Sequence, residues 1–150
     1  DAVVTYEPVA SELLAQGGSK LFDSRKIPNT IIDVLAIRTD LIDSHASAIR
    51  HLVQSHFKAL DHLTRNPQDA AYRMASHLKL KAADVLPAIK GLVLPDAAYN
   101  RRLLSGTKPE LLVTAGKLSS VMVKSKLLKQ DDSLSSLIRA DLLPTDSANR

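Results

Sequence analysis

The feature that most constrains the fold is a change of apolar pattern near residue 40 of this 150-residue chain. Before that point apolar residues come in short runs, and after it they recur at helical spacing. Residues 31–37 are nearly all apolar and rich in β-branched side chains, which favours a strand. Residues 2–5 and 20–23 are shorter candidates of the same kind, and unbroken apolar runs are typical of strands buried on both faces. Residues 1–40 are therefore predicted to be rich in strands.

Residues 41–144 are predicted to be helical. Between residues 46 and 65 the apolar side chains fall on one helical face. Asn66 and Pro67 suit the cap and the first position of a second helix, and Pro87 is expected to bend or shorten a third. The predicted helices cover residues 9–15, 46–65, 67–78, 82–92, 95–104, 110–128 and 133–139. Residues 145–150 are predicted to form a polar tail.

Composition argues against several classes of function. The chain has no cysteine, which excludes disulfides, thiol catalysis and cysteine-ligated metals. Its net charge of +4 would suit a nucleic-acid partner, but the 20 Lys and Arg residues are scattered and the five aromatic residues are too few for a base-stacking platform. We therefore expect no nucleic-acid partner. No apolar run approaches the roughly 18 residues of a membrane span.

Catalytic and metal-binding motifs are not evident in the sequence. Successive histidines are six, five, six and fifteen positions apart, whereas a helical metal pair stands at i and i+4. No serine lies in a G-x-S-x-G motif, and Gly17-Gly18 lacks the Lys-Ser or Lys-Thr that ends a phosphate loop. The only adjacent carboxylates, Asp131 and Asp132, lie in a predicted exposed linker. We predict no catalytic residue, no metal and no cofactor.

Three polar residues follow the first predicted strand. Thr5, Tyr6 and Glu7 lie at its carboxyl end, where ligands bind in open α/β sheets, and Pro8 favours an extended geometry at Glu7. These three residues are candidate ligand-binding residues. A second interpretation stays open on spacing alone: Glu7 caps the helix predicted at residues 9–15, and Tyr6 packs against the core.

The sequence D-A-V-V-T-Y-E-P at residues 1–8 resembles the D-A-x-x-x-W/Y-E-P segment of the extracytoplasmic solute-binding proteins of nitrate, sulfonate, taurine and thiamine-precursor ABC transporters. Other segments follow in the order of that family, and the similarity covers nearly the whole chain. These segments are L-F-D-S at 21–24, I-P at 27–28, residues 31–40, N-P-Q-D-A at 66–70, the helix at 111–128 and A-D-L-L-P at 140–144.

The resemblance implies an α/β, type II periplasmic-binding-protein-like fold, of which this chain would be the C-terminal portion, starting inside a core strand. It implies that Thr5, Tyr6 and Glu7 face a cleft between two lobes. The loop residues Pro28, Asn29 and Thr30 are expected to face the same cleft. The sequence departs from the family at Val9, where relatives often carry an aromatic residue. Without the first lobe the sheet edges would be open, so the isolated chain is expected to dimerise or to swap segments.

The function that this resemblance implies is non-enzymatic capture of a small anion, such as a sulfonate or nitrate, for an ABC permease. The implied location is periplasmic or extracytoplasmic, with membrane association if the protein is a lipoprotein. An alternative is the ligand-sensing domain of a membrane-bound signalling protein with the same fold. An enzyme of thiamine-pyrimidine synthesis would need histidine and cysteine motifs that we do not find. A helical interaction domain without a small-molecule ligand is a further alternative.

Overall fold

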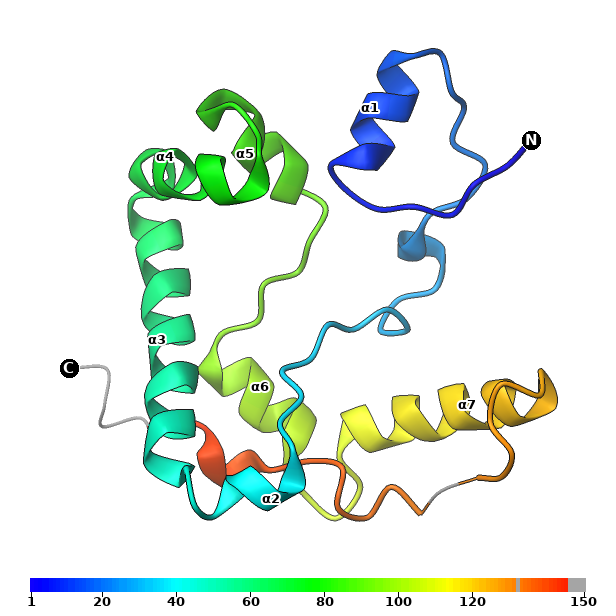
Figure 1. Ribbon diagram of the computed structural model, residues 1–150, viewed down its shortest axis with the longest axis vertical. Helices are drawn as coiled ribbons and strands as arrows, with labels where there is room; N and C mark the ends of the chain where they lie inside the picture. Colours follow the sequence, from blue (N-terminus) through cyan, green and yellow to red (C-terminus); the bar gives the residue numbers. More distant parts are fainter. Residues whose placement is uncertain (132, 146–150) are drawn as a thin grey trace. The chain divides into compact units, whose positions relative to one another are not determined.

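The computed structural model describes residues 1–131 and 133–145, and these residues form helices joined by coil, with no strand among them (Figure 1). The α-helices are α1 (Val9–Ala15), α2 (Thr39–Ile42), α3 (Ala46–Arg65), α4 (Pro67–Leu78), α5 (Ala82–Ile89), α6 (Ala97–Leu104) and α7 (Glu110–Lys124). Two 3₁₀ turns accompany them, η1 (Ser24–Lys26) and η2 (Ala140–Leu142). No helix in the described residues is long and apolar enough to cross a membrane.

The predicted α/β fold with N-terminal strands is wrong. Residues 2–5, 20–23 and 31–37 are coil, and most of their apolar side chains are exposed. The physical reason is that a high β-propensity describes how well a side chain fits a pleated, half-buried surface, so it forms a strand only where a neighbouring strand completes the ladder. Neither described unit of this chain offers these segments such a neighbour.

The helical predictions are largely confirmed. Helices α1, α3 and α4 begin and end at the predicted residues. Helix α5 ends three residues early, after Pro87 in its last turn, and α6 begins two residues late because Asp96 caps it by accepting a hydrogen bond from Tyr99 N–H at 2.7 Å. The helix predicted at residues 133–139 is wrong: these residues form turns, with Leu134 at a φ of 56°. Of the predicted polar tail at 145–150, only Thr145 lies within the described residues.

Two compact units make up the chain. The first comprises Asp1–Pro28 and Ala59–Leu94, and the second comprises Asn29–Lys58 and the chain from Pro95 onward, so that helix α3 contributes to both. In the first unit α4 packs on α5. The buried side chains of both helices are small: Ala70 and Ala71 of α4 are buried, and Val85 of α5 is fully buried.

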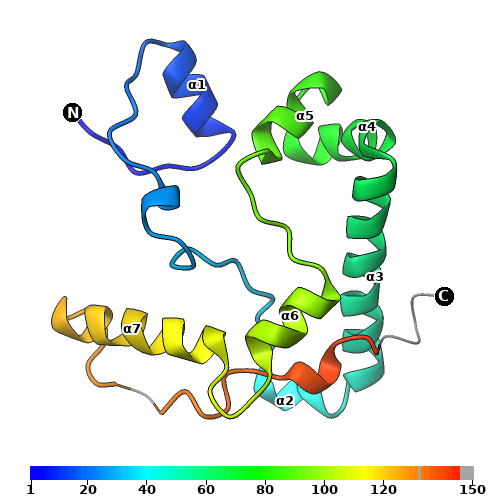
Figure 2. The ribbon, with the colours of Figure 1, turned by 180° about the vertical axis from the view of Figure 1, so that it is seen from behind.

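In the second unit α6 packs on α7, and the segment after α7 returns to α3 and α6 (Figure 2). Two arginines secure this return by donating to main-chain carbonyls. Arg50 of α3 lies 2.6 Å from the Asp141 oxygen, and Arg101 of α6 lies 2.9 Å from the Pro144 oxygen. Leu142 of η2 is buried as a result.

Candidate functional site

Glu7 lies just before α1 in the first unit, and its carboxylate serves that helix. Ser11 N–H, in the first turn of α1, donates to Glu7 Oε2 at 3.2 Å, and Ala10 N–H donates to the Tyr6 main-chain oxygen at 3.1 Å. A negative charge beside a helix N-terminus is favourable because the first N–H groups carry partial positive charge. Of the two interpretations of Glu7, the structure therefore contains the contact expected for the first turn of α1, from Ser11 N–H to the Glu7 carboxylate.

Thr5 and Tyr6 present their hydroxyl groups to solvent. The Tyr6 side chain is 84% exposed, so it does not pack against a core, and its hydroxyl has no hydrogen-bond partner among the described residues. The Thr5 hydroxyl makes only a long contact, 3.5 Å to the Tyr6 main-chain oxygen. The Tyr6 hydroxyl is thus available to donate to a ligand, and the Thr5 hydroxyl can donate to one in exchange for this long contact.

The predicted loop residues Pro28, Asn29 and Thr30 are divided between the two units. Pro28 closes the first unit with Thr5–Glu7, while Asn29 and Thr30 open the second, and all three are exposed. Asn29 has a φ of 58°, a left-handed conformation that asparagine tolerates better than most residues. Thr114 of α7 donates to its main-chain oxygen at 3.4 Å, which leaves the Asn29 side-chain amide exposed.

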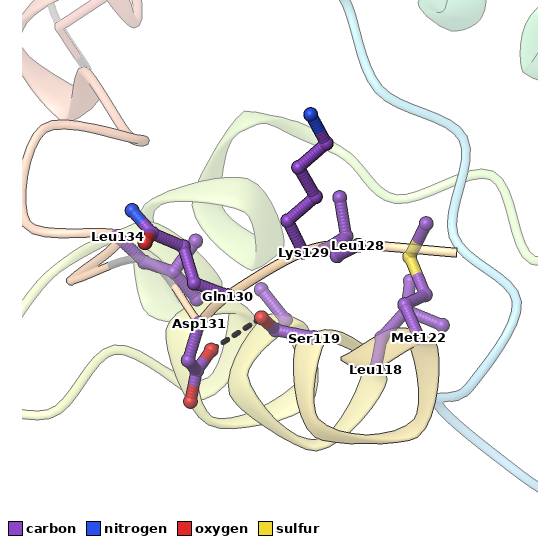
Figure 3. Close-up of a pocket in the computed structure, with 9 residues that line it drawn as sticks. Leu118, Ser119, Met122, Leu128, Lys129, Gln130, Asp131 and Leu134 are labelled. Carbon is purple, nitrogen blue, oxygen red and sulfur yellow. Dashed lines mark hydrogen bonds between the residues drawn. The ribbon is translucent and has the colours of Figure 1, made fainter. Parts of the chain in front are cut away.

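A groove of about 600 Å³ in the second unit was not predicted from the sequence (Figure 3). Its walls are one face of α7 and the segment that turns back along it. The lining residues are Ala115, Leu118, Ser119, Met122, Leu128, Lys129, Gln130, Asp131 and Leu134. The sequence signal was the apolar face of α7, which we interpreted as a packing face only.

One polar pair lies within this apolar groove. Ser119 is only 5% exposed, and its hydroxyl donates a hydrogen bond to Asp131 Oδ1. Lys129 extends away from this pair in Figure 3. Asp131 lies in exposed coil, as predicted, and its hydrogen bond joins this coil segment to α7.

Several acidic side chains elsewhere pair with neighbouring basic side chains. In the first unit Asp69 Oδ2 lies 2.7 Å from Arg73 Nε and 2.6 Å from His62 Nε2, and these contacts, Arg73 first, lower the pKa of Asp69. The hydrogen bonds from Arg25 lower the pKa of Asp23 to about 2. The described residues contain no group of three His, Asp or Glu side chains that could hold a metal ion.

One serine and one histidine are in contact, at the start of α3. Ser44 Oγ lies 2.8 Å from His45 Nδ1, and both residues are exposed. A nucleophilic serine needs a base that a third group orients, together with donors for the oxyanion. Within the described chain no group binds the other ring nitrogen of His45. This contact therefore lacks the arrangement of a catalytic dyad.

The predicted residues of the first unit offer neutral hydrogen-bond donors, the hydroxyls of Thr5 and Tyr6, whereas Asn29 and Thr30 belong to the second unit. Such donors suit the oxygen atoms of a small oxyanion. Comparisons of the chain with family models, curated proteins and solved structures found no match. The resemblance to solute-binding proteins consequently stays a prediction made from the sequence.

Proposed function

We propose that this chain is a non-enzymatic solute-binding component of an ABC importer and binds a small oxyanion such as a sulfonate or nitrate. The observation that supports the proposal is the exposed Thr5-Tyr6-Glu7 segment, where the Tyr6 hydroxyl has no partner among the described residues and the Thr5 hydroxyl makes one long contact. The proposal keeps the ligand chemistry of the resembling family and does not depend on an α/β fold.

The side chains of this segment would have different roles in binding. The Glu7 carboxylate accepts from Ser11 N–H, so part of its hydrogen-bonding capacity is directed to α1 and not outward. The Tyr6 hydroxyl can donate one hydrogen bond to an anion oxygen, and the Thr5 hydroxyl can do so in exchange for its long contact with the Tyr6 main-chain oxygen. Tyrosine also offers an apolar ring, which suits the alkyl part of an organic sulfonate.

Thermal denaturation in the presence of anions tests the proposal. A ligand that binds only the folded state stabilises it by about 2.7 kcal/mol at a hundred times its Kd. We expect taurine, ethanesulfonate or nitrate to raise the Tm of the wild-type protein relative to chloride at equal ionic strength. Tyr6→Phe removes only the hydroxyl and should abolish most of this increase.

Tyr72→Phe is the matched control because Tyr72 is 76% exposed in the same unit and belongs to no predicted site. It should respond to anions like the wild type. The proposal is wrong if none of these anions raises the Tm, or if Tyr6→Phe and Tyr72→Phe respond equally.

A second candidate is a helical docking module for another protein. The observation that favours it is the large number of exposed apolar side chains on the helices, including Leu52 of α3 and Leu118 and Val121 of α7. This candidate predicts no stabilisation by any small anion, so the same denaturation experiment separates the two.

A further inference from the structure

Residues 32–37 form a stretch of coil between the bend at residue 31 and α2 (Figure 1). Within the described chain, none of their main-chain N–H or C=O groups takes part in a hydrogen bond. Unpaired main-chain groups in a row are a template for pairing with another strand.

The side chains of this segment suit a strand on both faces. In an extended chain, Ile32, Val34 and Ala36 would point to one face, and Asp33, Leu35 and Ile37 to the other. Val34 is 66% exposed and Leu35 is 60% exposed. The segment contains no proline, glycine or lysine, the residues that usually block pairing at an exposed edge.

We propose that residues 31–37 form a self-pairing strand, through which two copies of this chain associate. The identical segment of a second copy offers the same unpaired main-chain groups and the same β-branched side chains. This association is independent of anion binding and goes beyond the proposed function.

The charge of Asp33 selects the orientation of the two strands. In a parallel pair in register, the two Asp33 carboxylates would lie directly opposite each other, and opposed like charges destabilise a strand pair. An antiparallel pair of residues 31–37 is centred on Val34 and places each Asp33 opposite Leu35 of the other copy. The antiparallel dimer is therefore the arrangement that the sequence of the segment favours.

The association is expected to be weak and dependent on concentration, because a ribbon of only two strands is marginally stable. Sedimentation velocity from about 5 to 500 μM should show a dimer fraction that rises with concentration. Hydrogen exchange measured across the same range should show increasing protection of the amides of residues 32–37.

Three substitutions distinguish main-chain pairing from nonspecific hydrophobic association. V34P removes a donor from the segment and should leave the protein monomeric. V34T keeps the N–H group and the β-branched shape, so its dimer fraction should stay close to that of the wild type. V93P places proline at another exposed valine in coil, 79% exposed, and should not change the association.

Circular dichroism at 222 nm verifies that each variant retains the helical content of the wild type. With that content retained, a monomer in V34P and dimers in V34T and V93P support the proposal. A wild-type protein that is monomeric at every concentration would overturn it. So would a V34P protein that dimerises like the wild type, or a loss of association in V93P as large as in V34P.

Discussion

Replacing Val85 by alanine tests the packing of α4 on α5. Val85 is fully buried, and it is the largest side chain in the described residues with less than 2% exposure. The substitution removes two methyl groups from a fully buried position of α5, the helix that packs on α4. At about 0.8 kcal/mol for each buried carbon, plus a cavity term, we expect a loss of about 2 kcal/mol.

Urea denaturation followed at 222 nm measures this loss. With a slope of about 2 kcal/mol per molar urea, a destabilisation of 2 kcal/mol lowers the midpoint by about 1 M. Val121→Ala is the matched control, since Val121 is also helical but 58% exposed, and its midpoint should change by less than 0.3 M, roughly 0.5 kcal/mol. Equal midpoints for Val85→Ala and Val121→Ala would refute the reasoning, because they would show that Val85 is not a core residue.

Three further predictions concern helix ends and one turn. Asp96→Ala removes the N-cap of α6 and should destabilise the second unit by about 1 kcal/mol, seen as faster hydrogen exchange of the α6 amides; unchanged exchange would contradict the capping contact. Lys79→Gly should stabilise the protein by roughly 0.5–1 kcal/mol in urea denaturation, because Lys79 ends α4 with a φ of 56°, and a destabilised variant would refute this. The low pKa of Asp23 implies that its bond with Arg25 contributes stability above pH 3.8 that is lost as the pH falls towards about 2. Arg25→Ala should accordingly raise the carboxyl midpoint of Asp23, followed by carbon NMR, towards 3.8, whereas an unchanged midpoint would contradict the assignment.

Helices could be located from the sequence because their signals are local. The apolar periodicity of α3 and the Asn66-Pro67 boundary depend on residues a few positions apart, and both helix ends there are confirmed. The strands predicted at residues 2–5 and 31–37 required partners elsewhere in the chain, which no local pattern supplies. The apolar character of these segments was evident in the sequence, but the sequence did not show whether another strand would pair with them.

The groove could not be predicted for a similar reason. Ser119 and Asp131 meet because the chain reverses at Lys126, which has a φ of 59°. A lysine gives no sequence signal for a left-handed turn, where glycine or asparagine would. The predicted continuation of this helix to residue 128 is replaced by a turn in which the Leu127 and Leu128 N–H groups both donate to the Met122 oxygen.

For the six predicted ligand residues, the sequence indicated chemical types but not positions. It identified Tyr6 as either packed or ligand-facing, and the exposed ring excludes packing. The sequence also left Glu7 with two possible roles, ligand binding and helix capping. The structure contains the helix contact, in which Ser11 N–H donates to the Glu7 carboxylate. The distribution of these residues over two units depends on contacts along the whole chain and has no local signature.

The measurement that tests the central claim most directly is an NMR titration of the ¹⁵N-labelled protein with taurine, ethanesulfonate and nitrate, with chloride as the reference. The account predicts saturable shifts in the amide signals of Thr5, Tyr6 and Glu7 with at least one of these anions. Spectra that do not change, or shifts confined to residues outside Thr5–Glu7, would contradict the claim that this segment binds a small oxyanion.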